Sequence, residues 1–466
     1  MEKDLVLKCL DDKLELMDEN LRHQIRQIII DQKITIVVLD DDPTGTQAIH
    51  DVPVLTTWKE EDIHDQLKEG VLLFFILTNS RGCLEAKARE INLEIGHHLK
   101  NAADKAQRKV IVISRSDSTL RGHYPLEVDA LQEGLGYGKC LKILAMTFVE
   151  GGRFTMDDVH YIKQDDNELI PVSDTPFARD KTFGYQNADL KKYVAEKTNG
   201  KVVAEQVQSF SLRDIEEKSS VLLAQIINYL EPDTTCIVNA VSYQDLQKFA
   251  LALLISKQQF IIRSAASIIP AIVGMEKRPL LGAEELELLQ TSGSLIIVGS
   301  HVPLSSSQLS HLLQNEPDCQ PLEFEVKSVL EQENAEYING LTGKVNHLLA
   351  NGKNVVLYTS RELVTVTDRF QSLSISKLIS ENLIKIVQNL KVRPACIVAK
   401  GGITSSDIAT EGLSVKKVKV LGQILPGIPV WQLGKESKFP GLSYIVFPGN
   451  VGQENSLTRI FGMIKT

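Results

Sequence analysis

The sequence predicts an α/β protein of two domains, each with a mostly parallel sheet flanked by helices, and an active site in the cleft between the domains. Three observations favour this fold class. The chain has 466 residues, which is too long for one ordinary hydrophobic core. Its short apolar runs are continuous, as in strands covered on both faces, and most are separated by polar segments with helical spacing.

The elements of the first half follow in a regular order. Residues 1–33 have the spacing of an amphipathic helix and are interpreted as a helical extension. Apolar runs then recur as ITIVVL, VLLFFILT, VIVIS, LKILAMTF, CIVN and FIIR. These runs predict a substrate-binding domain over residues 34–275. Ligands of such sheets bind beyond the carboxyl ends of the strands.

A second series of strands and helices is predicted after a junction. Residues 271–294 contain Pro, Gly and charged residues, as is typical of a connection between domains. The runs that follow include LIIVGS, NVVLYTS, ACIVAKGG, VKVLGQIL and YIVFPGN. They predict a second α/β domain over residues 290–466, without an internal repeat.

Composition excludes several classes of protein. The net charge of −9 argues against a protein that binds duplex nucleic acid, because neutralising phosphates requires a basic surface. The six cysteines are scattered and have no CxxC spacing, so we expect free thiols in a reducing cytosol. Charges throughout residues 1–30 argue against a signal peptide, and no apolar run reaches the ~18 residues of a membrane span. We expect a cytoplasmic protein with no membrane partner.

Three consecutive carboxylates, Asp40 to Asp42, directly follow the first apolar run. Arg81, Arg115 and Asp117 follow later runs, so they are expected at the same edge of the sheet. A guanidinium binds a carboxylate through two hydrogen bonds, whereas a carboxylate accepts hydrogen bonds from hydroxyls and can serve as a general base. Together these residues predict a site for a polyhydroxy acid. Arg121, Glu150, Arg153 and His160 are further polar residues of this kind.

Two other readings of the first half stay open. Any one of these arginines is more often a surface residue, and Asp117 could simply cap a helix. The stretch from Asp40 to Thr44 also satisfies the DxDxT pattern of haloacid-dehalogenase-type phosphohydrolases, with Asp40 as nucleophile and Asp42 as acid/base. The later motifs of that class fit poorly, and it leaves the second half unexplained. A sugar-acid sensor without catalytic activity is a third reading.

Glycine-bearing turns between strands and helices mark the second half, which contains no Walker P-loop. Gly401 and Gly402 form one such turn, Gly449 and Gly452 a second, and Gly299 with Ser300 a third. Adjacent glycines let backbone N–H groups approach a phosphate, and a helix N-terminus adds partial positive charge. Three turns of this kind favour binding of nucleotide phosphates.

Six motifs, in this order, resemble those of the four-carbon acid sugar kinase family. They are DDDPTGTQ, TNSRG, RSDSTLRGHYPLE, EGGRFT, GGIT and FPGNVG. The resemblance extends from Ile34 to the C-terminus. It implies a kinase that uses ATP and Mg²⁺ to phosphorylate the terminal hydroxyl of a sugar acid such as threonate, erythronate or 3-oxo-tetronate. It also implies that the N-terminal domain holds the acid and the C-terminal domain holds ATP.

Site residues are carried over from the family motifs one by one. The catalytic candidates are Asp41 and Asp42, one of which is expected to deprotonate or orient the attacking hydroxyl. The candidates for substrate binding are Thr44, Gly45, Arg81, Arg115, Asp117 and Arg263, with Arg81 and Arg115 expected to hold the substrate carboxylate. The candidates for ATP binding are Ser300, Gly401, Gly402, Ile403, Thr404, Gly449, Asn450 and Gly452. The metal ligands are left open.

The chain also departs from the family pattern. PTGTQ replaces the FTGA of the shorter acid-sugar kinases, and residues 157–187 are longer than their counterpart there. This places the chain in a longer subgroup and leaves its substrate open among the four-carbon acids. For the longer segment we expect a lid or an oligomer contact, and a homodimer is left open.

Overall fold

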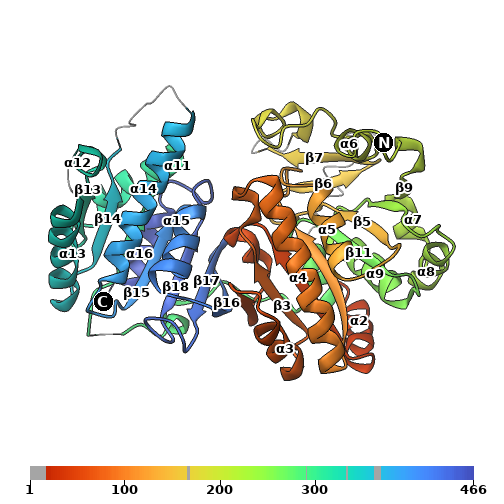
Figure 1. Ribbon diagram of the computed structural model, residues 1–466, viewed down its shortest axis with the longest axis horizontal. Coiled ribbons are helices and arrows are strands. Elements are labelled where there is room, and N and C mark those ends of the chain that lie inside the picture. Colours follow the sequence, from red (N-terminus) through yellow and green to blue (C-terminus); the bar gives the residue numbers. More distant parts are fainter. Residues whose placement is uncertain (1–16, 165–167, 290, 332–333, 362–368, 466) are drawn as a thin grey trace. The chain divides into compact units, whose positions relative to one another are not determined.

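The computed structural model describes residues 17–164, 168–289, 291–331, 334–361 and 369–465 (Figure 1). The chain forms two compact units. The first comprises Met1–Ile49 and Thr57–Lys277, and the second comprises His50–Thr56 and Arg278–Thr466. The sequence placed residues 50–56 in the first domain, but the structure assigns them to the second unit.

The first unit contains a parallel sheet in the order β3-β1-β4-β11-β5-β10-β9. Its strands are β1 (Ile34–Asp40), β3 (Leu73–Leu77), β4 (Lys109–Arg115), β5 (Leu141–Ala145), β9 (Gln208–Phe210), β10 (Thr235–Val238) and β11 (Phe260–Ser264). Every residue of β1, β3 and β11 is buried, so both faces of the sheet are covered. The expectation from continuous apolar runs is therefore confirmed.

Helices cover this sheet in two packed groups. The first group is α3 (Glu60–Glu69), α4 (Glu85–Ala106) and α5 (Leu126–Gly134), and α4 contacts both of the others. The second group is α2 (Glu19–Asp31), α8 (Ser220–Asn228), α9 (Tyr243–Ile255) and α10 (Ile268–Val273), together with the short α7 (Leu212–Glu217). Asp18 caps α2, and the buried Ile25 and Ile29 lie on the face that packs on this group.

A small antiparallel sheet is added to the first unit. It consists of β6 (Arg153–Met156), β7 (Val159–Lys163) and β8 (Leu169–Pro171). Two short 3-10 helices and α6 (Leu190–Lys197) follow it. Residues 157–187, the segment that the sequence marked as long, belong mostly to this addition, and residues 165–167 lie outside the described part.

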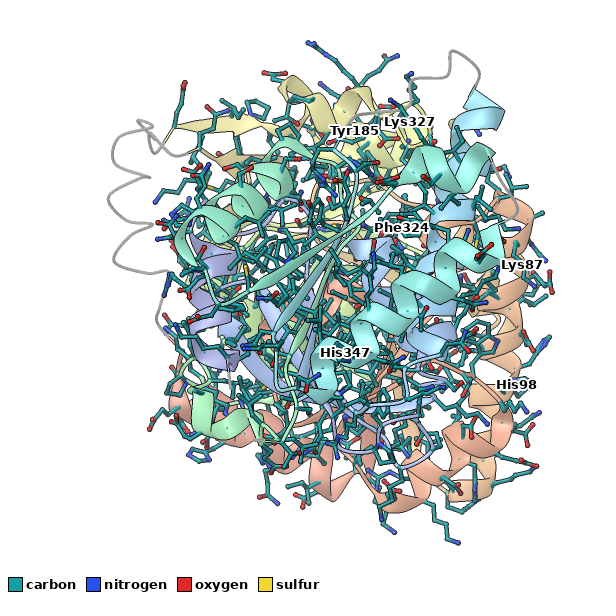
Figure 2. The ribbon with its side chains drawn as sticks, turned by 90° about the vertical axis from the view of Figure 1, so that its left-hand side faces the viewer. Lys87, His98, Tyr185, Phe324, Lys327 and His347 are labelled. Atoms are coloured by element: carbon teal, nitrogen blue, oxygen red, sulfur yellow. The ribbon has the colours of Figure 1, made fainter. Side chains whose placement is uncertain are left out.

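The second unit contains a mixed sheet. Five strands pair in parallel in the order β13-β14-β12-β15-β18, and β17, β16 and β2 continue the sheet antiparallel. Their bounds are β13 (Gln320–Phe324), β14 (Val355–Thr359), β12 (Leu295–Val298), β15 (Cys396–Lys400), β18 (Ser443–Phe447), β17 (Ile428–Leu433), β16 (Lys417–Leu425) and β2 (Val52–Leu55). Phe324, labelled in Figure 2, ends β13 with a fully buried side chain.

The helices of the second unit follow its parallel strands. They are α11 (Pro303–Asn315), α12 (Val326–Glu331), α13 (Asn334–Ala350), α14 (Arg369–Gln388), α15 (Gly402–Asp407) and α16 (Ser456–Ile464). Pro303 lies at the start of α11, where its missing N–H costs no hydrogen bond. Two α/β domains are therefore present, as the sequence predicted. In the part of the chain that the structure describes, no helix has the length and apolar character needed to cross a membrane.

Candidate active site

The acidic triplet begins with a buried ion pair. Asp40 is the last residue of β1 and pairs in register with Arg115, the last residue of β4. Its carboxylate lies 2.9 Å from Arg115 Nη1, and the side chains are 2% and 5% exposed. Burial raises the pKa of Asp40 to about 7, although Arg115 opposes this shift. A Cβ on Gly45 would lie 1.7 Å from Asp40 Oδ2, so only glycine fits against this pair.

Asp41 forms the second pair of the triplet. Arg81 donates to it through Nη2 at 2.6 Å and Nε at 3.1 Å, which is the two-pronged geometry that suits a guanidinium. The hydroxyl of Ser116 also donates to Asp41. Burial opposes ionisation, but Arg81 and Arg263 hold the pKa of Asp41 below its usual value. Asp41 is therefore a fixed anion that orients Arg81.

Asp42 is the most exposed carboxylate of the triplet. Its side chain is 24% exposed, compared with 3% for Asp41 and 2% for Asp40. It accepts the backbone N–H and the hydroxyl of Thr44, and it lies 3.3 Å from Arg81 Nη1. These contacts fix the carboxylate at the start of a 3-10 helix, Pro43–Ala48, and leave it accessible to a ligand.

Arg263, expected to bind substrate, belongs to a third buried pair. It is 4% exposed, and its Nη1 donates to Glu127 and to Ser114, at 2.8 Å in each case. Glu127 also accepts from the hydroxyl of Ser80. The pair thus connects the adjacent strands β4 and β11 with Ser80, which follows β3 on the other side of β1. Glu127 ends the motif RSDSTLRGHYPLE but was not predicted from the sequence as a site residue.

Asp117 lies on the turn that follows β4. It accepts from Arg121 Nε at 2.8 Å. Burial alone would raise the pKa of Asp117, but Arg81 and Arg121 lower it well below its usual value. On its other side Arg121 lies 3.6 Å from Asp180, and its guanidinium carbon lies 4.9 Å from the ring centre of Phe177. Of the predicted residues of the first unit, Asp42, Arg81 and Asp117 are partly accessible, whereas Arg115 and Arg263 are buried in pairs.

The three glycine turns of the second unit meet at one edge of its sheet. Gly299, Gly401 and Gly449 follow β12, β15 and β18, which are adjacent strands. A Cβ on Gly299 would lie 2.3 Å from Thr404 Oγ1, and a Cβ on Gly449 would lie 2.7 Å from Ser300 Oγ. Gly401 has a φ of +124°, a conformation that side chains rarely adopt. The turns are therefore in contact, and their close packing requires glycine.

Hydrogen bonds hold these turns together. Ser305 Oγ donates to the carbonyl of Gly449 at 2.9 Å and lies 3.0 Å from Ser300 Oγ, whose hydroxyl can donate to it. Gly402 and Thr404 lie in the first turn of α15 and are partly exposed, and Asn450 and Gly452 are exposed. The backbone of Ile403 belongs to α15, but its side chain lies outside the described part. Seven of the eight predicted ATP-binding residues are thus described in full, and they lie in these three turns.

Two basic residues at these turns were not predicted from the sequence as site residues. Lys400 is fully buried, and its Nζ donates to the carbonyl of Pro448 at 2.6 Å above the ring of Phe447. Burial lowers the pKa of Lys400 to about 7. Arg361 Nη1 donates to the carbonyl of Ser300 at 2.7 Å. Lys400 lies inside the motif AKGGIT, but only the structure shows that its amine is turned to the backbone.

The described residues offer no protein cage for a metal ion. They contain no group of three or more His, Cys, Asp or Glu side chains arranged to hold one. A Mg²⁺ ion that accompanies a nucleotide keeps water and phosphate ligands and needs only one or two carboxylates.

Two domain families match the chain. Residues 36–272 match the family described as a sugar-binding N-terminal domain, and residues 295–457 match the one described as a nucleotide-binding C-terminal domain. The protein is therefore a two-domain protein with a sugar-binding and a nucleotide-binding part. This pair of domains defines the four-carbon acid sugar kinase family, and the chain belongs to it. The resemblance found in the motifs is thus confirmed.

Solved structures show the same fold at low sequence identity. A Haemophilus influenzae protein of the DUF1537 family matches with a TM-score of 0.63 and 17% identity, over 92% of this chain and 100% of that chain. A protein from Salmonella typhimurium LT2, provisionally named a tRNA synthase, matches with a TM-score of 0.68 and 16% identity, over 91% and 98%. At such identities the likeness shows the fold alone. No curated protein matches the chain.

Proposed function

We propose that the protein is a kinase that transfers the γ-phosphoryl group of ATP to the terminal hydroxyl of a four-carbon sugar acid of the threonate, erythronate or 3-oxo-tetronate type. The observation that carries the proposal is Asp42, an accessible carboxylate held beside Arg81 in the sugar-binding domain of a chain that also has a nucleotide-binding domain. Five free cysteines in the described part fit a reducing cytoplasm, where ATP is abundant.

In the sugar-binding unit, Asp42 is the residue that acts on the acceptor hydroxyl. It accepts the hydroxyl proton as the oxygen attacks the γ-phosphorus, and the bond from that phosphorus to the β-phosphate oxygen breaks to release ADP. Arg81 binds the substrate carboxylate, because it is partly exposed and already oriented by Asp41. Arg115 was expected to share that role, but it is neutralised by Asp40 and buried. We assign it to holding Asp40 instead.

In the nucleotide-binding unit, backbone amides hold the phosphates. The amides around Gly401–Thr404 and Gly449–Gly452 lie in glycine-bearing turns next to helix starts, where backbone N–H groups can approach a phosphate. Mg²⁺ bound with ATP spreads the charge of the transferring group. Direct transfer requires that the two ligands meet in the working enzyme with water excluded, so closure of the domains is part of the proposal.

The structure disfavours a phosphohydrolase of the haloacid-dehalogenase type. Its nucleophile would be Asp40, which must reach the phosphorus of a substrate. Asp40 is 1% exposed and is bound to Arg115, so its carboxylate cannot make that approach.

An ATP-consumption screen tests the proposal. The protein is incubated with ATP, Mg²⁺ and each member of a panel of four-carbon sugar acids, and ADP release is followed. We expect release with at least one acid and none with the Asp42→Asn variant. Phosphate release from a phosphorylated acid without ATP would instead identify a phosphohydrolase. Tight binding of an acid without ATP consumption would identify a sensor.

A further inference from the structure

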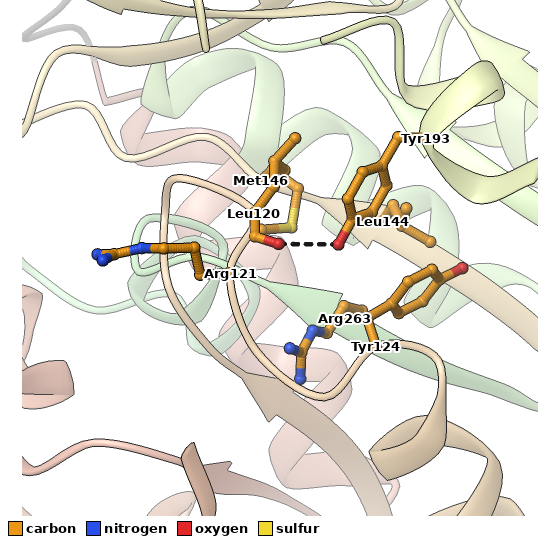
Figure 3. Close-up of a pocket in the computed structure, with 7 residues that line it drawn as sticks. All are labelled: Leu120, Arg121, Tyr124, Leu144, Met146, Tyr193 and Arg263. Carbon is orange, nitrogen blue, oxygen red and sulfur yellow. Dashed lines mark hydrogen bonds between the residues drawn. The ribbon is translucent and has the colours of Figure 1, made fainter. Parts of the chain in front are cut away.

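Three consecutive carbonyls of the turn after β4 accept hydrogen bonds from side chains of residues 153–164 and 168–197, the described residues that are called the 153–197 segment below. The carbonyls belong to residues 118–120, within the motif RSDSTLRG. His160 Nε2 lies 2.9 Å from the first, the hydroxyl of Tyr185 lies 2.7 Å from the second, and that of Tyr193 lies 2.9 Å from the third. Figure 3 shows the bond between Tyr193 and Leu120. Tyr185 is also labelled in Figure 2.

The three donor side chains are buried, and burial keeps each in the protonation state that its hydrogen bond requires. His160 is fully buried, and Tyr185 and Tyr193 are 5% and 3% exposed. Burial raises the pKa of both tyrosines far above the usual value and lowers the pKa of His160 to about 4. His160 is therefore neutral near pH 7. Its Nε2 carries the proton because that atom faces a carbonyl, and its Nδ1 accepts from the hydroxyl of Thr155 at 3.0 Å.

The turn combines one strained residue with internal side-chain bonds to Asp117, which accepts from Arg121 Nε at 2.8 Å and from the hydroxyl of Thr119. Leu120 is buried and has a φ of +68°, a left-handed conformation that is costly for a residue with a side chain. Within the turn, Leu120 N donates to the carbonyl of Asp117 at 3.2 Å, and Thr119 N donates to the Asp117 carboxylate at 3.3 Å. Both of these backbone N–H donations are long. The three carbonyls of residues 118–120 are held from outside the turn, by donors of the 153–197 segment.

Packing beneath the turn leaves little room for it to shift. The ring of Tyr124 stacks on Tyr193 at 5.7 Å, and Tyr185 meets Tyr193 edge-on at 5.7 Å. A cavity of about 10 Å³, which is the size of one water molecule, remains between the turn and the segment. Its lining is shown in Figure 3 and consists of Leu120, Arg121, Tyr124, Leu144, Met146, Tyr193 and Arg263.

The opposite side of the turn presents groups of the sugar site. Asp117 faces Arg81 and Arg121, and Arg121 is flanked by Phe177 and Asp180 of the same segment. We propose that the 153–197 segment is a fixed wall of the sugar-acid site, in which His160, Tyr185 and Tyr193 position Asp117 and Arg121 for the substrate. The inference rests on the proposed function and gives the segment a positioning role in place of the expected lid or oligomer contact.

Removing single hydroxyl groups tests the inference. Tyr185→Phe and Tyr193→Phe keep the rings and delete one hydrogen bond each. We expect KM for the preferred sugar acid of the screen to rise about fivefold for each variant and more for the double variant, in line with the usual strength of one hydrogen bond. KM for ATP stays within twofold. The control is Tyr137→Phe, which removes a hydroxyl bonded to Gln259 in the same unit and leaves both KM values unchanged.

Hydrogen exchange supplies a readout that does not depend on catalysis. In the ligand-free double variant, the amides of Thr119 and Leu120 are expected to exchange faster than in the wild type, whereas those of β1 do not change. If the wild type phosphorylates no acid but exchange accelerates at the turn, the proposed function fails and the support of the turn stands. Unchanged sugar-acid KM and unchanged exchange at the turn would overturn the inference. Equal rises in both KM values with faster exchange throughout the unit would also overturn it, because they indicate a general loss of stability.

Discussion

The two candidate ligand-binding regions of the molecule consist of different kinds of residue. The strand ends of the sugar-binding unit carry charged side chains that are largely neutralised by one another, in the pairs Asp40–Arg115, Asp41–Arg81 and Glu127–Arg263. The strand ends of the nucleotide-binding unit carry glycine turns whose closest neighbours are small hydroxyl residues. In the proposed kinase, one region recognises its ligand through oriented charges, and the other through exposed backbone.

This difference predicts different sensitivities. In the sugar-binding unit a change of charge or of hydrogen-bond geometry is damaging, because each buried ion depends on its partner. In the nucleotide-binding unit the addition of a single methyl group is damaging, because it fills the space that a turn or a phosphate needs. Substitutions that change charge or hydrogen bonding in the first unit, and substitutions that add a methyl group in the second, test this difference.

The largest effect is expected for Asp42→Asn. The amide keeps the size of the side chain but cannot accept the hydroxyl proton, so turnover falls by about a thousandfold, within the usual range for loss of a general base. ATP affinity, measured by titration calorimetry, is expected to stay at the wild-type value. Turnover close to the wild-type rate would remove Asp42 from its assigned role.

Arg81→Lys and Arg115→Lys separate substrate binding from structural pairing. Lysine cannot keep the two-pronged contact by which Asp41 orients Arg81, so the cation is no longer directed at the substrate carboxylate and KM for the sugar acid rises about 30-fold. The unfolding midpoint falls less than in Arg115→Lys, because the side chain of Arg81 is 20% exposed. Arg115 is buried against Asp40, so Arg115→Lys mainly lowers the midpoint of thermal unfolding, by several degrees. Steady-state kinetics and calorimetry measure the two effects. The reverse pattern would return the carboxylate-binding role to Arg115.

Gly299→Ala tests the glycine turns. The new methyl group would lie 2.3 Å from Thr404 Oγ1 and displace the turn, so ATP binding weakens about tenfold while sugar-acid binding does not change. Gly343→Ala is the matched control, because a Cβ at this position in α13 meets nothing within 4 Å. It is expected to leave both affinities unchanged. Equal ATP affinities for the two variants would contradict the role of the turns.

The smallest effect concerns pH. The folded protein keeps His160 neutral with a pKa of about 4, whereas in the unfolded chain the residue takes up a proton near its ordinary value of 6.5. Its contribution to stability is complete above pH 6.5 and is lost as the pH falls through 4. His160→Gln should therefore flatten the fall of the unfolding midpoint between pH 6.5 and pH 4. If the unfolding midpoint falls equally with pH in the wild type and in His160→Gln, protonation of His160 is not the cause of the fall.

Local sequence predicts the fold because the central parallel strands, such as β1, β3, β12 and β15, are continuous apolar runs, and residues after such runs fall at one edge of a parallel sheet. That is why Asp42, Arg81 and Gly401 could be chosen. The strand Val52–Leu55 was assigned to the wrong domain because its partner, β16, begins at Lys417, far along the chain. No local pattern encodes such a pairing.

The sequence is less informative about pairing between side chains. Arg81, Arg115 and Arg263 all follow or end apolar runs and look equivalent. All three pair with a carboxylate, and only the structure shows that the side chain of Arg81 is 20% exposed whereas those of Arg115 and Arg263 are 5% and 4% exposed. The role of the 153–197 segment is hidden for the same reason, because its side chains bind backbone carbonyls, which have no signature in a sequence.

The most direct test of the central claim is phosphorus NMR of the product formed from ATP and the preferred four-carbon acid. The account predicts a new phosphomonoester coupled to the protons of the terminal carbon, formed in equal amount to ADP and absent with Asp42→Asn. ADP matched by inorganic phosphate alone, or a phosphoryl group on another oxygen of the acid, would contradict it.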